Sequence, residues 1–217
     1  TYAGPQVRVG FRAERGLFDC AGDREGSEFA LSLDGARPMV NAVLWAEATA
    51  IAELAGRVGD TALRTRFARK ADGLERNIRA RLWNPDVGFF VSLGVDGTRD
   101  TVKELHGYAP FYYGMPLGAD YAVAWRPLAD PLGFSAPRGL TFPAQDAPGF
   151  ARAPDPEAHE CLWNGPSWPY ATSVALTALY GQLQRTDGVC PEGVSADGFV
   201  RLLRQYAAQH VRRREDG

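Results

Sequence analysis

Two tryptophans, an amide and a carboxylate lie close together between residues 159 and 172, in the segment HECLWNGPSWPYAT. Glu160, Trp163, Asn164 and Trp168 are separated here by two prolines and a glycine, a composition typical of a loop. Indole faces can lie against the C–H faces of a sugar ring, while amide and carboxylate groups hydrogen-bond its hydroxyls. The segment therefore predicts a carbohydrate-binding loop. The alternative is that both tryptophans fill the core.

A second group of polar side chains lies in residues 23–28, DREGSE, where three carboxylates fall within six residues. Gly26 allows a tight turn that could present the carboxyl group of Glu28 for acid–base chemistry. The alternative is an ordinary solvated surface, because runs of charge usually face water.

The remaining titratable residues exclude several kinds of site. The chain has three histidines and three cysteines, all widely spaced: His106, His159, His210, Cys20, Cys161 and Cys190. Such spacing matches neither a metal-ligand motif nor a disulfide framework, and it makes a Ser-His-Asp triad improbable. We expect no metal and no other cofactor.

Charge and hydropathy limit the partners of the protein. The net charge of -2 gives no reason to expect nucleic acid, and the basic residues 212–214 are followed at once by two acidic ones. No apolar run approaches the roughly 20 residues that span a membrane. We expect a soluble protein, with the cytoplasm slightly favoured as its compartment; the oligomeric state is not determined.

The elements that must position these residues are mostly helical. Apolar residues recur at helical spacing, with Asp60 and Ser195 as N-caps, and one short β-hairpin interrupts the helices. The expected helices are 37–57, 61–82, 108–113, 119–128, 167–184 and 196–213, and the expected hairpin strands are 88–93 and 100–105. Residues 1–19 are expected to be irregular or short strands, and residues 130–158 a long loop. The fold class is all-α with a small inserted β-hairpin.

Three segments resemble one known family. Besides residues 159–172, they are RPMVNAVLWAEA at 37–48 and ELHGYAPFY at 104–112. Their order and spacing resemble those of the mannosylglycerate-hydrolase-like glycoside hydrolases, which are related to glycoside hydrolase family 63 and, more remotely, to trehalases. The resemblance spans residues 18–217.

The resemblance implies an (α/α)6 toroid, or a C-terminal portion of one, that hydrolyses an α-linked sugar with inversion. Inversion requires a general acid and a general base. The resemblance assigns the acid to the turn Gly26-Ser27-Glu28, hence to Glu28, with Asp23 and Glu25 as alternatives. It places the base just beyond Gly217. Residues 1–217 are therefore expected to form a single helical glycosidase-like domain that is incomplete at its C-terminus. Whether an N-terminal part is also missing is left open.

The resemblance also implies which residues contact the sugar. The substrate-binding candidates are Trp163, Asn164, Trp168, Glu160, Arg37, Asn41 and Glu104. For Arg37 and Asn41 the alternative is a helix cap or a buried structural group, and for Glu104 it is an exposed position after a strand. Two alternative functions share this fold: a sugar-binding protein without hydrolysis, and an epimerase, which the low histidine count disfavours.

Overall fold

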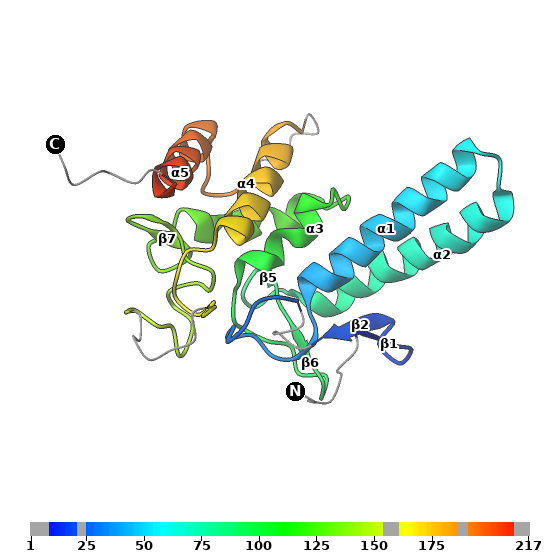
Figure 1. Ribbon diagram of the computed structural model, residues 1–217, viewed down its shortest axis with the longest axis horizontal. Helices are drawn as coiled ribbons and strands as arrows, with labels where there is room; N and C mark the ends of the chain where they lie inside the picture. Colours follow the sequence, from blue (N-terminus) through cyan, green and yellow to red (C-terminus); the bar gives the residue numbers. More distant parts are fainter. Residues whose placement is uncertain (1–8, 21–24, 154–160, 186–190, 211–217) are drawn as a thin grey trace.

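The computed structural model describes residues 9–20, 25–153, 161–185 and 191–210 (Figure 1). Helices α1 (Pro38–Arg57) and α2 (Thr61–Asn77) run side by side as an antiparallel hairpin that projects from the rest of the molecule. Asp60 caps α2 by accepting a hydrogen bond from the backbone N–H of Leu63 at 2.8 Å, which confirms the prediction. The last turn of the predicted second helix, η2 (Ile78–Leu82), is a π-helix that leads directly into a strand.

Three helical segments meet at the centre of the molecule. They are α1, the pair η3 (Leu105–Tyr108) and α3 (Ala109–Tyr112), and α4 (Pro169–Leu183). Helices α1, α3 and α4 share a small apolar cluster formed by Met39, Ala42, Ala109 and Val174. Each has a proline in its first turn, where the missing N–H costs no hydrogen bond. The starts of these helices therefore define one region of the molecule.

The predicted hairpin of 88–93 with 100–105 is confirmed only around its turn. The N–H of Gly94 donates to the carbonyl of Thr98 at 2.8 Å, Leu93 and Arg99 form an isolated antiparallel bridge, and the N–H of Asp100 donates to the carbonyl of Ser92 at 2.9 Å. The strands themselves find other partners: β5 (Phe89–Phe90) pairs with β4 (Trp83–Asn84), and β6 (Leu93–Gly94) pairs with β3 (Gly35–Ala36). Beyond this point the carboxylate of Asp100 accepts hydrogen bonds from the N–H groups of Leu33, Thr101 and Val102, and the predicted strand to residue 105 does not form.

The N-terminal segment completes a small antiparallel sheet. Strands β1 (Gly10–Arg12) and β2 (Leu17–Cys20) extend it in the order β1-β2-β3-β6, which confirms the expectation of short strands at this end. Because β3 immediately precedes Arg37, this sheet fixes where α1 begins.

The long segment after residue 130 is more ordered than its sequence predicted. It contains a two-stranded hairpin of β7 (Ser135–Ala136) and β8 (Gly139–Leu140), and its Phe134 and Phe142 are fully buried in the main core. The preceding helix η4 (Ala119–Leu128) is a 3-10 helix, and its Trp125 stacks on Tyr108 with ring centroids 4.9 Å apart. Core packing therefore holds a segment whose composition is typical of a loop.

The C-terminal helix α5 (Ala196–Gln209) packs against α4. Its predicted cap is confirmed, because the Ser195 hydroxyl accepts a hydrogen bond from the N–H of Gly198 at 3.1 Å. The predicted continuation of this helix to residue 213 lies partly outside the described residues. Among the described helices, none combines the length and the hydropathy that a membrane span requires.

Gly107 offers a test of this packing. A methyl group here would overlap the ring of Phe89 and the carbonyl oxygen of Phe90, so we expect Gly107→Ala to lower the free energy of unfolding by about 1–3 kcal/mol. Gly73 in α2 has open space around it, so Gly73→Ala should raise this free energy by roughly 0.5–1 kcal/mol. Urea unfolding measures both, and a stabilising Gly107→Ala would contradict the packing described.

Candidate functional site

Three segments that are distant in the sequence converge at the starts of the central helices. Arg37 is the N-cap of α1, Glu104 the N-cap of η3, and Trp168 the N-cap of α4. The side chains of Arg37 and Glu104 form an ion pair at 3.2 Å, and Trp168 is linked to them through Trp163 and His106. The fold therefore brings together all three sequence motifs.

The guanidinium group of Arg37 is the centre of this arrangement. It is only 1% exposed, and each of its five N–H groups has an acceptor. The acceptors are a carboxylate oxygen of Glu25, the Glu104 carboxylate at 3.2 Å, the Ser27 hydroxyl at 3.3 Å, and the carbonyl oxygens of Ser32 at 3.2 Å and Leu33 at 3.4 Å. No N–H group remains for a sugar, so the alternative of a buried structural group describes Arg37 in this structure.

Both carboxylate oxygens of Glu104 are likewise occupied by hydrogen-bond donors. One of its carboxylate oxygens accepts hydrogen bonds from the N–H groups of Leu31 at 2.9 Å and Ser32 at 3.0 Å. The other accepts from the Ser32 hydroxyl and from Arg37. The alternative that Glu104 is an exposed residue after a strand is wrong, because the side chain is buried. Glu104 and Arg37 together clamp the backbone of residues 31–33.

Glu25 and His106 complete the buried network. The Glu25 carboxylate is bound by Arg37, accepts from the Ser27 hydroxyl at 3.1 Å, and lies 3.4 Å from Nδ1 of His106. Burial raises the pKa of Glu25, but the hydrogen bond to His106 and the positive charge of Arg37 outweigh it and lower the pKa to about 2. Glu25 is therefore ionised at neutral pH and is poorly suited to donate a proton. The other alternative acid, Asp23, lies outside the described residues.

The sequence did not identify His106 as part of the site. His106 lies in the 3-10 helix that begins directly after Glu104, so no strand alternation marks it, and its closeness in sequence to Glu104 is the signal that could have linked the two. Oε2 of Glu25 and Nε2 of His106 are buried without a hydrogen-bond partner. A cavity of about 10 Å³ beside this network has room for one water molecule at most.

Glu28 lies on the loop that this network fixes. The carbonyl oxygen of Glu28 accepts a hydrogen bond from the N–H of Trp163 at 3.0 Å, so the acidic loop and the tryptophan loop are in direct contact. The next residue, Phe29, has a φ of 58°, a left-handed conformation that is strained for a bulky side chain. Such strain persists only where the surroundings impose it, here at the position that follows the candidate acid.

The two tryptophans stack on each other, with ring centroids 4.5 Å apart and planes 7° from parallel. Trp163 is only 7% exposed and also packs edge-on against Phe142 at 4.7 Å. Trp168 is half-buried, and its indole N–H donates to the carbonyl oxygen of Leu162 at 3.1 Å. Trp163 is therefore a core residue that supports Trp168, and only Trp168 has appreciable exposed surface.

The amides of Asn41 and Asn164 bind backbone rather than solvent. Asn41 is fully buried; it accepts from the N–H of Phe18 at 2.8 Å and donates to the carbonyls of Phe18 and Arg37, each at 2.9 Å. This is the structural alternative considered for Asn41, and it joins β2 to the start of α1.

Asn164 closes a loop in a similar way. Its amide oxygen accepts from the N–H of Ala151 at 3.1 Å, and its NH₂ group donates to the carbonyl of Gly149 at 2.9 Å. The predicted sugar ligand Glu160 lies outside the described residues. Among the described residues, no three His, Cys, Asp or Glu side chains are grouped to hold a metal ion.

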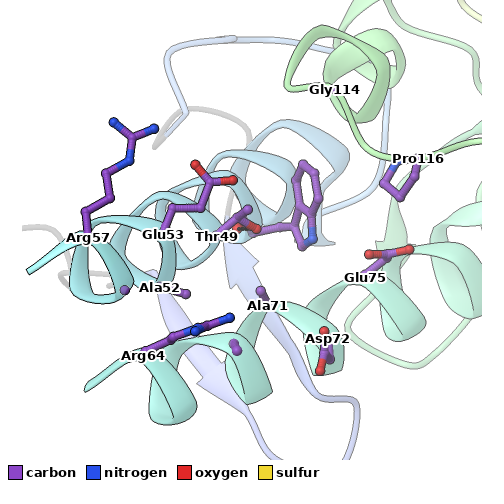
Figure 2. A pocket seen from close by; sticks show the side chains of 13 residues that line it. Thr49, Ala52, Glu53, Arg57, Arg64, Ala71, Asp72, Glu75, Gly114 and Pro116 are labelled. Carbon is purple, nitrogen blue, oxygen red and sulfur yellow. Dashed lines mark hydrogen bonds between the residues drawn. The ribbon is translucent and has the colours of Figure 1, made fainter. Parts of the chain in front are cut away.

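Two larger cavities lie away from this chemistry. One, a groove of about 920 Å³ between α1 and α2, is lined by Glu53 and Arg57 of α1 and by Arg64 and Asp72 of α2 (Figure 2). A second, more apolar cavity of about 490 Å³ is bordered by residues of the β1–β2 hairpin and by α1 and α2. Neither is lined by Glu28 or by the tryptophan loop. Because the groove lacks a buried charge network, we place the candidate site at the helix starts despite its smaller space.

The described residues form a largely helical fold in which the three sequence motifs meet beside stacked indoles. The family profile of the mannosylglycerate hydrolase MGH1-like glycoside hydrolase domain matches residues 8–217, so the chain belongs to this family. Among solved structures, it is similar to a sialidase with 28% sequence identity and a TM-score of 0.83. The match covers 93% of this chain and 18% of the sialidase, so the chain spans less than a fifth of that protein's length. Among curated proteins no significant match is found.

The pKa of Glu25 gives a prediction for acid stability. Since the pKa is about 2 in the folded state and 4.5 in the reference state, the stabilisation is complete above about pH 5 and is lost as the pH falls towards 2. We expect Glu25→Gln to lower the free energy of unfolding at pH 7 by about 3–5 kcal/mol and to flatten its fall in this range. Urea unfolding at several pH values measures this.

Glu75→Gln provides the matched control, because Glu75 of α2 forms a partly exposed ion pair with Arg79 of η2. Removing such a pair should change the free energy of unfolding by less than about 1 kcal/mol. Equal effects of the two substitutions would contradict the buried network.

Proposed function

We propose that this chain is part of a glycosidase that cleaves an α-linked sugar with inversion, with Glu28 as the general acid. The observation that carries the proposal is the hydrogen bond from the Trp163 N–H to the Glu28 carbonyl oxygen at 3.0 Å. It joins the acidic turn, to which the resemblance assigns the acid, to the loop that holds the indoles. Arg37 binds the Ser27 hydroxyl of the same turn at 3.3 Å, and with Glu104 it clamps residues 31–33 that follow.

The chemical environment of Glu28 supports this assignment. A general acid must be protonated when substrate binds and must reach the leaving oxygen. Among the described residues, Glu28 forms no ion pair, and the residue is half-buried. Glu25 and Glu104, by contrast, are both bound to Arg37.

The general base requires a second carboxylate, roughly 6.5–9.5 Å from the first in an inverting enzyme. Both carboxylate oxygens of Glu104 already accept hydrogen bonds, and Glu25 is buried and paired with Arg37, so we propose neither as the group that activates water. We assign the base to a part of the full-length protein outside this chain. The helices described here would then form one portion of an (α/α)6 toroid, as a single helical glycosidase-like domain.

The predicted substrate-binding residues divide into two groups under this proposal. Trp168 is the sugar platform, with Trp163 packed behind it. The other described candidates position the loops through backbone hydrogen bonds: Arg37, Asn41, Glu104 and Asn164. Glu160 remains a proposed ligand for sugar hydroxyls.

Glu28→Gln tests the proposal in the full-length gene product, assayed with aryl α-glycosides and α-linked disaccharides. We expect turnover to fall by about 10²–10⁴-fold with sugar binding retained, because the substitution removes the proton donor and keeps the shape. Proton NMR of the first product should show the β-anomer, as inversion requires.

Glu53→Gln is the control, since Glu53 lies in the groove between α1 and α2 and should leave turnover unchanged. Unchanged turnover in Glu28→Gln would refute the assignment. A parent protein that binds sugars without cleaving them would favour the alternative, a catalytically incomplete sugar-binding member of the family.

A further inference from the structure

Three tyrosines lie close together where α1, α3 and α4 meet. Tyr112 and Tyr113 are at the end of α3, and Tyr170 is the second residue of α4. Tyr113 packs against the apolar cluster shared by these helices, so packing accounts for it. Tyr112 and Tyr170 are 39% and 56% exposed, and core packing accounts for neither ring.

Tyr170 is the exposed outer member of a chain of rings that reaches the buried network. Its ring centroid lies 6.3 Å from that of His106, whose ring contacts Trp163 at 5.6 Å. Burial, followed by the Tyr112 hydroxyl and the Glu25 carboxylate, raises the pKa of Tyr170, which agrees with its position beside His106. The tyrosines and the Glu25–Arg37 network therefore border the same region.

Tyr112 is the last residue of α3, which packs against α4, and Tyr170 lies in the first turn of α4. The Tyr112 ring stands edge-on to that of Tyr113, with centroids 4.9 Å apart and planes at 89°. Burial raises the pKa of Tyr113, as do the hydroxyls of Tyr170 and Tyr112 and the carboxylate of Glu47. Two exposed tyrosine rings thus lie at the junction of α3 and α4, whereas the indole of Trp163 is covered.

We infer that Tyr170 and Tyr112 form an outer sugar-binding subsite, in which a pyranose ring lies against the exposed face of Tyr170 and its hydroxyls hydrogen-bond the tyrosine O–H groups. Aromatic side chains with one polar tip suit a ligand that has both apolar faces and hydroxyls. The inference takes its ligand class from the proposed function and adds a second contact region beyond Trp168. A ligand with two sugar units should therefore use it more than a ligand with one.

Binding measurements in a Glu28→Gln background test this independently of catalysis. The probes are maltose and an α-linked mannobiose, with methyl α-glucoside and methyl α-mannoside as single-unit comparisons, titrated by calorimetry into the full-length protein. Tyr170→Ala should weaken disaccharide binding by roughly five- to twentyfold, and Tyr170→Phe should retain most of it, because the ring supplies the larger share. The methyl glycosides should be affected less than the disaccharides.

Tyr180→Ala is the matched control, because Tyr180 lies on the same helix α4, is 53% exposed and contacts Phe199 of α5 instead. It should leave binding unchanged, and circular dichroism of each variant checks folding. Equal disaccharide affinity of Tyr170→Ala and its parent would overturn the subsite, as would a lack of binding by every probe. Loss of binding in Tyr170→Ala together with an inactive parent enzyme would support the subsite while refuting the proposed hydrolysis.

Discussion

The buried guanidinium of Arg37 is the interaction on which the site depends. Taking a guanidinium and two carboxylates out of water carries a large desolvation cost, which only complete hydrogen bonding offsets. All five N–H groups of Arg37 and both oxygens of Glu104 have partners, and of the two carboxylates only Oε2 of Glu25 has none. Most of these partners belong to residues 25–33, so the network specifies the conformation of one loop.

The same logic extends to the rest of the site. Asn41 joins α1 to β2, and Asn164 joins the tryptophan loop to residues 149–151, in both cases through backbone groups. In the tryptophan loop, Trp163 stacks on Trp168 and supports its ring from behind. The described polar residues around Glu28 thus act mainly as supports, while Trp168, Tyr112 and Tyr170 keep exposed surface and Glu28 is half-buried.

The sequence predicted the long helices because their apolar residues repeat at a clear period and their caps are explicit, as at Asp60 and Ser195. It predicted short strands near the N-terminus but not the pairing of the later strands, which are two residues long and, as at Phe89–Phe90, bury consecutive side chains. No alternation marks such strands, and their partners are chosen by distant parts of the chain. For Arg37 the sequence left a sugar contact and a buried structural role open, because hydrogen-bond saturation depends on tertiary contacts, and for Glu104 it did not predict burial.

A crystal structure of the full-length protein with a bound, uncleaved α-glycoside would test the central claim most directly. The account predicts a Glu28 carboxyl oxygen about 2.6–3.2 Å from the glycosidic oxygen, above an unchanged Arg37 network. A substrate bound elsewhere, or a Glu28 side chain pointing into bulk water, would contradict it.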